Sequence, residues 1–238
     1  MFAIASNLQA ILQRIEAATA AARRPAGSVA LIAVSKTFPA AAIEAAHAAG
    51  QRAFGENYVQ EALAKMAELE ARRALTSGAD RPLEWHMIGP IQSNKTRAIA
   101  EHFDWVHSVD RLAIAERLAR HRPAHLAPLN LCLQVNISGE ATKSGVAPEQ
   151  LPALARAVSL LPGVRLRGLM GIPEPAPEPT RERSAFAALR VLRDVLREAQ
   201  IGVDELSMGM SADLEPAILE GATMVRVGTA LFGVRHAV

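Results

Sequence analysis

Short apolar runs alternate with amphipathic segments along the whole chain of 238 residues. The clearest run, residues 29–36, is rich in β-branched side chains and is bounded by Gly27 and Pro39, which predicts a strand buried on both faces. Ahead of it, apolar residues at i, i+3, i+4 and i+7 from Leu8 predict an amphipathic helix over residues 6–23. The chain therefore begins with a helix followed by a buried strand.

The same alternation continues to the end of the chain. Strands are predicted at residues 29–36, 51–55, 84–88, 105–107, 129–137, 164–170, 205–208 and 223–227. Helices are predicted at residues 39–49, 58–73, 93–101, 110–121, 148–160, 181–199 and 212–219, with Ser93, Asp110 and Ser211 as N-caps. Eight strands that alternate with helices favour an α/β fold, a single (β/α)8 TIM barrel with an extra N-terminal helix, as one domain over residues 1–238. An open doubly wound sheet is the alternative.

Composition narrows the class of protein. Lys and Arg number 26 against 24 Asp and Glu, and this near balance predicts no nucleic-acid surface. The single cysteine, Cys132, excludes an intramolecular disulfide, and no Cys/His spacing suggests a metal site. Strand alternation points Cys132 into the barrel, as a buried structural thiol. The sequence has neither a signal peptide nor an apolar run of membrane-spanning length. We expect a cytoplasmic protein that binds no membrane and stands as a monomer.

Functional residues of a parallel barrel lie in the loops that follow its strands. Lys36 ends the first strand, and desolvation at the mouth of an apolar interior lowers the pKa of a lysine toward nucleophilic use. The alternative is a lysine that extends its ammonium group to solvent.

Glycines and hydroxyl side chains follow the last two predicted strands. Ser207, Gly209 and Ser211 follow strand seven, and Gly228 and Thr229 follow strand eight. Backbone N–H groups at such strand-to-helix turns bind anions, and in barrels this position often holds a phosphate. The alternative is that the glycines serve turn geometry alone.

Strands eight and one are neighbours in a closed barrel, so the phosphate site would lie beside Lys36. This arrangement suits a Schiff base between Lys36 and the carbonyl group of a phosphorylated molecule. Two ligands fit, namely pyridoxal 5′-phosphate as a held cofactor or a sugar phosphate in a class I aldolase reaction.

Motifs spread over nearly the whole chain carry a family resemblance. They are residues 33–37, 54–58, 85–95, 168–170, 206–213 and 225–233, together with Asn136, Glu140, Lys143 and Gly145. In these motifs the sequence resembles the pyridoxal phosphate homeostasis proteins, whose fold-type III barrel is similar to the N-terminal domain of alanine racemase. The proline-rich residues 173–179 lie outside the resemblance.

The resemblance implies a set of cofactor-binding residues. Lys36 would hold pyridoxal 5′-phosphate as an aldimine, and Arg226 would face its pyridine nitrogen. The remaining positions are Asn57 near the cofactor and Ser207, Gly209, Gly228 and Thr229 around its phosphate. An arginine does not readily give up a proton, so the ring nitrogen would stay unprotonated and the cofactor would be a weak electron sink.

The resemblance also implies a function in intracellular vitamin B6 homeostasis. The protein would hold the cofactor and pass it to pyridoxal phosphate-dependent apoenzymes, with no catalytic residue and no committed turnover. The alternative is an amino-acid racemase of low activity. A racemase needs a second acid/base group opposite Lys36, which in alanine racemase is a tyrosine from an added β-domain. This chain ends at Val238, and its only tyrosine, Tyr58, follows strand two. Roles for His86 and Lys143 stay open.

Overall fold

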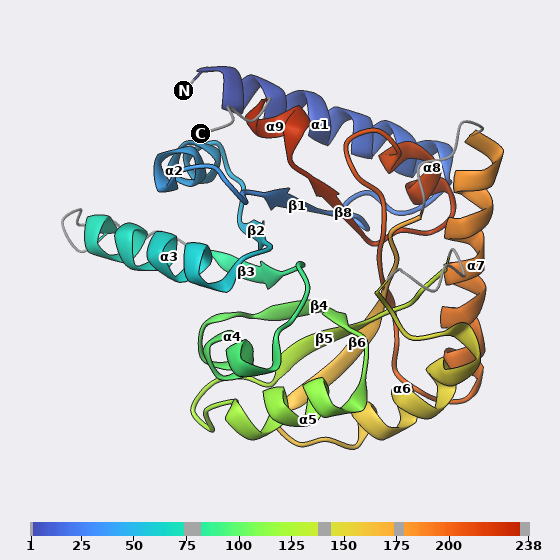
Figure 1. Ribbon diagram of the computed structural model, residues 1–238. Helices are drawn as coiled ribbons and strands as arrows, with labels where there is room; N and C mark the ends of the chain where they lie inside the picture. Colours follow the sequence, from blue (N-terminus) through green and yellow to red (C-terminus); the bar gives the residue numbers. More distant parts are fainter. Residues whose placement is uncertain (1, 74–81, 138–143, 174–178, 234–238) are drawn as a thin grey trace.

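Eight parallel strands form one closed barrel in the order β1 to β8 (Figure 1). The computed structural model describes residues 2–73, 82–137, 144–173 and 179–233. The predicted (β/α)8 barrel with an additional N-terminal helix is thus confirmed, and the open-sheet alternative is wrong.

The elements follow the predicted order with small shifts at their ends. The strands are β1 (Ala30–Val34), β2 (Ala53–Glu56), β3 (Glu84–Met87), β4 (Trp105–Val109), β5 (Leu129–Gln134), β6 (Val164–Met170), β7 (Glu205–Ser207) and β8 (Met224–Val227). The helices are α1 (Phe2–Ala21), α2 (Ala40–Ala48), α3 (Val59–Arg73), α4 (Thr96–His102), α5 (Leu112–His121), α6 (Leu151–Ser159), α7 (Pro179–Glu198), α8 (Leu214–Leu219) and α9 (Thr229–Phe232), with 3₁₀ turns η1 (Ser93–Lys95) and η2 (Pro148–Gln150).

Pairing of the first and last strands closes the barrel. Ile32 of β1 lies opposite Arg226 of β8, and Ala33 lies opposite Val227. Helix α1 covers this seam from outside, where it packs against α8 and α9 (Figure 1). Asn7 of α1 donates a hydrogen bond to the carbonyl oxygen of Leu231 over 3.0 Å. The predicted neighbourhood of strands one and eight is therefore confirmed.

Side chains that alternate along the strands form two separate cores. The large outer core lies between barrel and helices and contains the fully buried Phe54, Phe103 and Phe186. The small inner cluster consists of Ile32, Trp105, Cys132, Met170 and Met224. Cys132 therefore points into the barrel, as its alternation predicts, and burial raises the pKa of its thiol.

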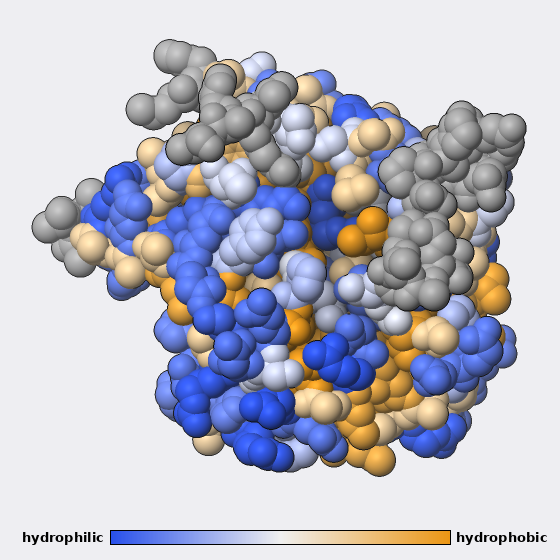
Figure 2. All heavy atoms as spheres, viewed as in Figure 1, coloured by the Kyte–Doolittle hydropathy of each residue, from blue (hydrophilic) through white to orange (hydrophobic). Residues whose placement is uncertain are grey.

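Hydrophilic residues cover most of the face in Figure 2, while hydrophobic ones show mainly at its centre and lower right.

Three predicted N-caps are wrong. Ser93 begins a 3₁₀ turn, and Asp110 forms an ion pair with Arg111 over 2.7 Å, so neither side chain caps the following helix. Helix α8 begins after Asp213, two residues beyond Ser211. Cap signals in the sequence are short and ambiguous, and tertiary contacts decide which residue starts the helix.

Strand β1 also ends earlier than predicted. Its last residue is Val34, and Lys36 lies in the turn that follows. Thr37 has a φ of 67°, a left-handed conformation that cannot continue a strand.

Residues 138–143, which include Glu140 and Lys143, and most of the proline-rich segment lie outside the described residues. Within the described ranges, no helix is long and apolar enough to cross a membrane.

We expect Gly168→Ala in β6 to destabilise the barrel. A Cβ at this position would lie 2.0 Å from the carbonyl oxygen of Glu205 in the neighbouring strand β7. Overpacking against backbone costs about 1–3 kcal/mol or more of unfolding free energy. The control is Gly202→Ala, whose Cβ would meet nothing within 4 Å. Guanidinium denaturation should separate the two variants, and equal midpoints would contradict the expectation.

Candidate functional site

The seven candidate residues lie at the carboxyl ends of four neighbouring strands. Barrel order places β7, β8, β1 and β2 side by side. The candidates are Ser207 and Gly209 on and after β7, Arg226, Gly228 and Thr229 on and after β8, Lys36 after β1, and Asn57 after β2. The structure thus brings residues from both ends of the sequence, Lys36 to Thr229, to one end of the barrel, its mouth.

Lys36 lies half-buried in the turn after β1. The preceding residue, Ser35, is fully buried and turns its hydroxyl outward to Glu56, 2.7 Å away. Lys36 lies two residues beyond Val34, the last residue of β1, and four residues beyond Ile32 of the inner cluster, so it stands at the mouth of the barrel.

Arg226 is a buried cation on the adjacent strand. Its side chain is 4% exposed and donates hydrogen bonds to Ser207 Oγ over 2.6 Å and to the carbonyl oxygen of Gly171 over 3.1 Å. Both acceptors are neutral, and Arg226 has no ion pair within the described residues. Burial lowers the pKa of Arg226 to about 10, so the guanidinium stays charged at neutral pH.

A chain of hydrogen-bonded side chains, buried except for Glu84 at its end, connects Arg226 to the opposite end of the barrel. Ser207 Oγ lies 2.7 Å from His107 Nδ1, and His107 Nε2 lies 2.9 Å from His86 Nδ1. His86 Nε2 lies 2.7 Å from Glu84 Oε1, at the amino end of β3. The two histidines and Ser207 are each no more than 2% exposed. This polar chain crosses the barrel interior from β3 to β8.

The direction of the hydrogen bonds follows from the two ends of this chain. Arg226 can only donate, and the carboxylate of Glu84 can only accept. Burial, followed by the repulsion that a protonated His86 and Arg226 would exert, holds the pKa of His107 well below its usual value, so its ring is neutral. When the ring of His86 is neutral as well, Ser207 donates to His107, His107 donates to His86, and His86 donates to Glu84. This last hydrogen bond lowers the pKa of Glu84.

The loop after β7 and the turn after β8 are packed against each other. Gly209 has a φ of 92°, and a Cβ there would lie 2.6 Å from Ala217 Cβ, so only glycine fits. Asp213 Oδ1 accepts the backbone N–H of Met210 over 2.5 Å and closes the loop. Ser211 Oγ lies 3.5 Å from the backbone nitrogen of Ala230 and faces the turn after β8.

The turn after β8 approaches the end of β1 closely. A Cβ on Gly228 would lie 3.3 Å from the carbonyl oxygen of Val34, so the glycine allows this contact. Thr229 is exposed at the start of α9. Asn57 is half-buried, and its backbone lies against Gly89, where a Cβ would come within 2.3 Å of the Asn57 carbonyl oxygen.

The structure gives Ser207 a different contact from the one expected of it. Its hydroxyl is fully buried and bonded to Arg226 and His107, so a phosphate contact from this residue would have to come from its backbone. Ser211 is the hydroxyl that faces the turn after β8. Sequence reasoning missed His107, although the alternation of residues 105–109 puts it on the same face as Trp105.

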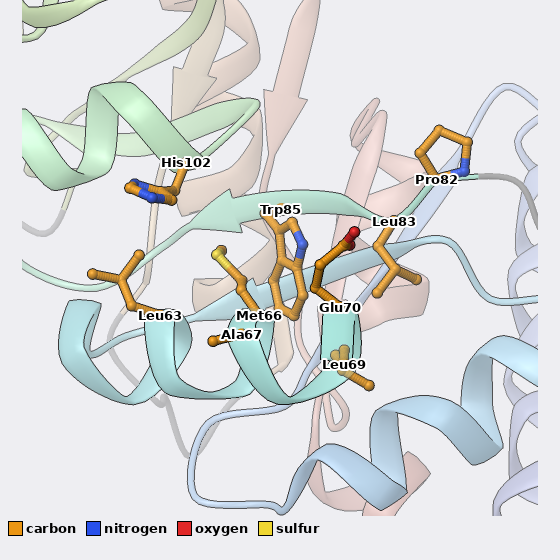
Figure 3. Close-up of a pocket in the computed structure, with 9 residues that line it drawn as sticks. All are labelled: Leu63, Met66, Ala67, Leu69, Glu70, Pro82, Leu83, Trp85 and His102. Atoms are coloured by element: carbon orange, nitrogen blue, oxygen red, sulfur yellow. The ribbon is translucent and has the colours of Figure 1, made fainter. Parts of the chain in front are cut away.

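A surface pocket lies apart from the barrel mouth. It has a volume of about 510 Å³ between α3, the start of β3 and the end of α4 (Figure 3). Its lining is mostly apolar, with Met66 beside Trp85 and with Glu70 as the one carboxylate. None of the candidate residues lines it. The described residues also contain no cluster of three or more His, Cys, Asp or Glu side chains able to hold a metal ion.

Fold and site together define a (β/α)8 barrel protein with a lysine in the turn after β1 and a buried arginine on the adjoining strand β8. Residues 6–236 match the family described as "Alanine racemase, N-terminal domain". A protein of Pseudomonas aeruginosa named "Pyridoxal phosphate homeostasis protein" is 63% identical over 235 residues, which cover 99% of this chain and 97% of that protein. The chain belongs to the family of pyridoxal phosphate homeostasis proteins.

Solved structures agree with this family. PipY of Synechococcus elongatus, solved with PLP bound, is 44% identical, has a TM-score of 0.81, and the match covers 97% of this chain and all of PipY. Alanine racemase from Corynebacterium glutamicum is 18% identical with a TM-score of 0.65, covering 98% of this chain and 61% of the racemase. The racemase likeness shows a shared barrel fold.

Neutral His107 should make the protein less stable at acidic pH. Below its usual pKa of 6.5, the unfolded chain takes up a proton at His107 that the folded protein excludes. Unfolding free energy should therefore fall by about 1.4 kcal/mol for each pH unit below 6.5, in addition to other titrating groups. Denaturant titrations of His107→Gln between pH 5 and 7.5 should show a flatter dependence. Exposed His125→Gln is the control, and equal slopes for His107→Gln and wild type would refute the assignment.

Proposed function

We propose that this protein binds pyridoxal 5′-phosphate, holds it covalently on Lys36, and serves intracellular vitamin B6 homeostasis. The observation that carries the proposal is that Lys36 follows β1, the strand paired with β8, which carries the buried Arg226, and that glycine turns follow β7 and β8. The PLP-bound relative PipY and the name of the Pseudomonas relative support it.

The residues at the mouth fit the chemical groups of this cofactor. When bound, pyridoxal phosphate supplies an aldehyde that reacts with primary amines and a pyridine ring that withdraws electrons. Lys36 offers the amine, and Arg226 offers guanidinium N–H groups beyond the two that Ser207 and Gly171 accept. Gly228 and Ser211 fit the phosphate, because the glycine keeps the turn open against Val34 and the hydroxyl faces that turn.

Arg226 favours storage of the cofactor over catalysis. A guanidinium that stays charged near neutral pH donates a hydrogen bond to a ring nitrogen without transferring the proton. Ser207 and the carbonyl of Gly171 hold this guanidinium in place. A ring that remains unprotonated stabilises carbanions poorly, so committed turnover is not expected.

We propose further that the protein acts as a monomer in the cytoplasm and passes the cofactor to apoenzymes. The seven candidate residues lie at one mouth of a single barrel, which supports a site formed within one copy of the chain. Tyr58, the only tyrosine, is 56% exposed at the start of α3, outside the buried polar chain.

Lys36→Ala should abolish covalent attachment of the cofactor. Wild-type protein incubated with pyridoxal phosphate and reduced with borohydride should carry the adduct on the peptide that contains Lys36. Lys95→Ala, which changes a half-buried lysine of η1, should retain it. Peptide mass spectrometry locates the adduct. An unchanged yield in Lys36→Ala, with the adduct on another lysine such as Lys143, would refute the assignment.

The loaded protein should not racemise alanine at ordinary enzymatic rates. Typical enzymes turn over about 1–10³ times per second. We expect incubation with L-alanine, followed by chiral chromatography, to yield D-alanine at rates orders of magnitude lower. Turnover in the enzymatic range would favour the racemase alternative instead.

A further inference from the structure

The turn that carries Lys36 has a strained backbone. Thr37 adopts a φ of 67°, and only two other non-glycine residues in the described ranges, Arg23 and Gln200, have positive φ. Such a conformation persists only where surrounding contacts hold it, and it is concentrated at functional sites. The contacts that hold Thr37 therefore also determine where Lys36 points.

One turn of helix α3 holds both peptide groups that flank Lys36. Lys65 Nζ donates to the carbonyl oxygen of Ser35 over 2.7 Å. Glu61 Oε1 accepts the backbone N–H of Thr37 over 2.5 Å. Glu61 and Lys65 are four residues apart on α3 and form an ion pair of 2.6 Å. The peptide before Lys36 and the peptide after it are thus fixed by one pair of side chains.

Lys65 is buried with all three of its N–H donors used. It is 6% exposed, and its acceptors are Ser35 O, Glu61 and Glu56 Oε1, the last at 2.8 Å. Glu56 is fully buried and also accepts the hydroxyl of Ser35 over 2.7 Å. Its second oxygen, Oε2, has no hydrogen-bond partner in the part of the chain that the structure describes. Burying such charges is costly unless they are paired. Lys65 is therefore a buried, paired cation and not a surface residue.

We propose that Glu61 and Lys65 are positioning residues for Lys36, which they hold from the helix layer outside the barrel. Ser35 faces outward to this pair, and the pair fixes both peptide groups that flank Lys36, so a contact on the outer face sets the direction of the lysine. The proposal rests on the covalent role of Lys36 proposed above. It adds a function for the turn of α3 that carries Glu61 and Lys65.

The experiment compares Glu61→Ala and Lys65→Met with matched controls on the same helix. Glu68→Ala and Arg72→Met remove another i,i+4 ion pair seven residues further along α3, whose side chains are 49% and 44% exposed. Two quantities are measured. The first is hydrogen exchange of the Thr37 amide in protein without cofactor, followed by NMR. The second is the rate at which pyridoxal phosphate attaches to Lys36, followed by borohydride trapping at timed points.

Loss of the Thr37 hydrogen bond should speed exchange of its amide about tenfold. Misdirection of Lys36 should slow attachment by about tenfold or more. Both control variants should match wild type in both measurements. Glu61→Gln keeps an oxygen that accepts the Thr37 N–H, so it should restore most of the protection and of the rate. Such a rescue distinguishes positioning from a merely stabilising role. If the pair only stabilised the fold, Glu61→Ala would lower the melting temperature and leave the attachment rate of the folded protein unchanged.

Two results would overturn the proposal. One is wild-type Thr37 exchange in folded Glu61→Ala, and the other is a wild-type attachment rate in that variant. If Lys65→Met does not fold, the double variant Glu56→Gln/Lys65→Met removes both buried charges and replaces it. Absence of trapping at Lys36 in wild type would instead refute the covalent role, while Thr37 exchange still tests whether the pair holds the turn.

Discussion

The buried guanidinium of Arg226 is the constraint around which the barrel mouth is arranged. A cation that is 4% exposed is tolerated only where its N–H groups find acceptors. Ser207 and the carbonyl of Gly171 supply two of these and carry no charge. His107 stays neutral beside them, because burial and the nearby positive charge both oppose its protonation. The mouth is therefore rich in hydrogen-bond donors and suited to an electron-rich ligand.

The inner and outer faces of the strands carry different groups of polar side chains. The inner face carries Arg226 and its polar chain, and the outer face carries Glu56, which contacts Lys65 of α3. Ser35, which directly precedes Lys36, belongs to the outer face through its hydrogen bond to Glu56. A rigid outer layer can in this way hold an inner side chain without any contact with the ligand.

Binding without turnover is a coherent property of this arrangement. A donor that does not release its proton leaves the nitrogen of a bound pyridine ring unprotonated, so the ring withdraws electrons weakly. Glycine turns can bind an anion through backbone N–H groups and add no acid or base. The histidines within the described barrel interior are committed to each other, to Ser207 and to Glu84. These contacts support the proposed retention of a cofactor over chemistry on a substrate.

The alternation of strands and helices could be predicted from sequence, as could the placement of Lys36 and Gly228 at strand ends. These features depend on local spacing, which the sequence displays directly. The polar chain could not be predicted, since His107 and Ser207 are 100 residues apart and meet only when the barrel closes. Lys65 likewise looks like any helix-surface lysine until α3 packs against the turn after β1. Sequence by itself determined the order of elements and the position of Lys36 after the first strand, whereas tertiary structure decided which buried groups contact its turn, because these groups are distant in the chain.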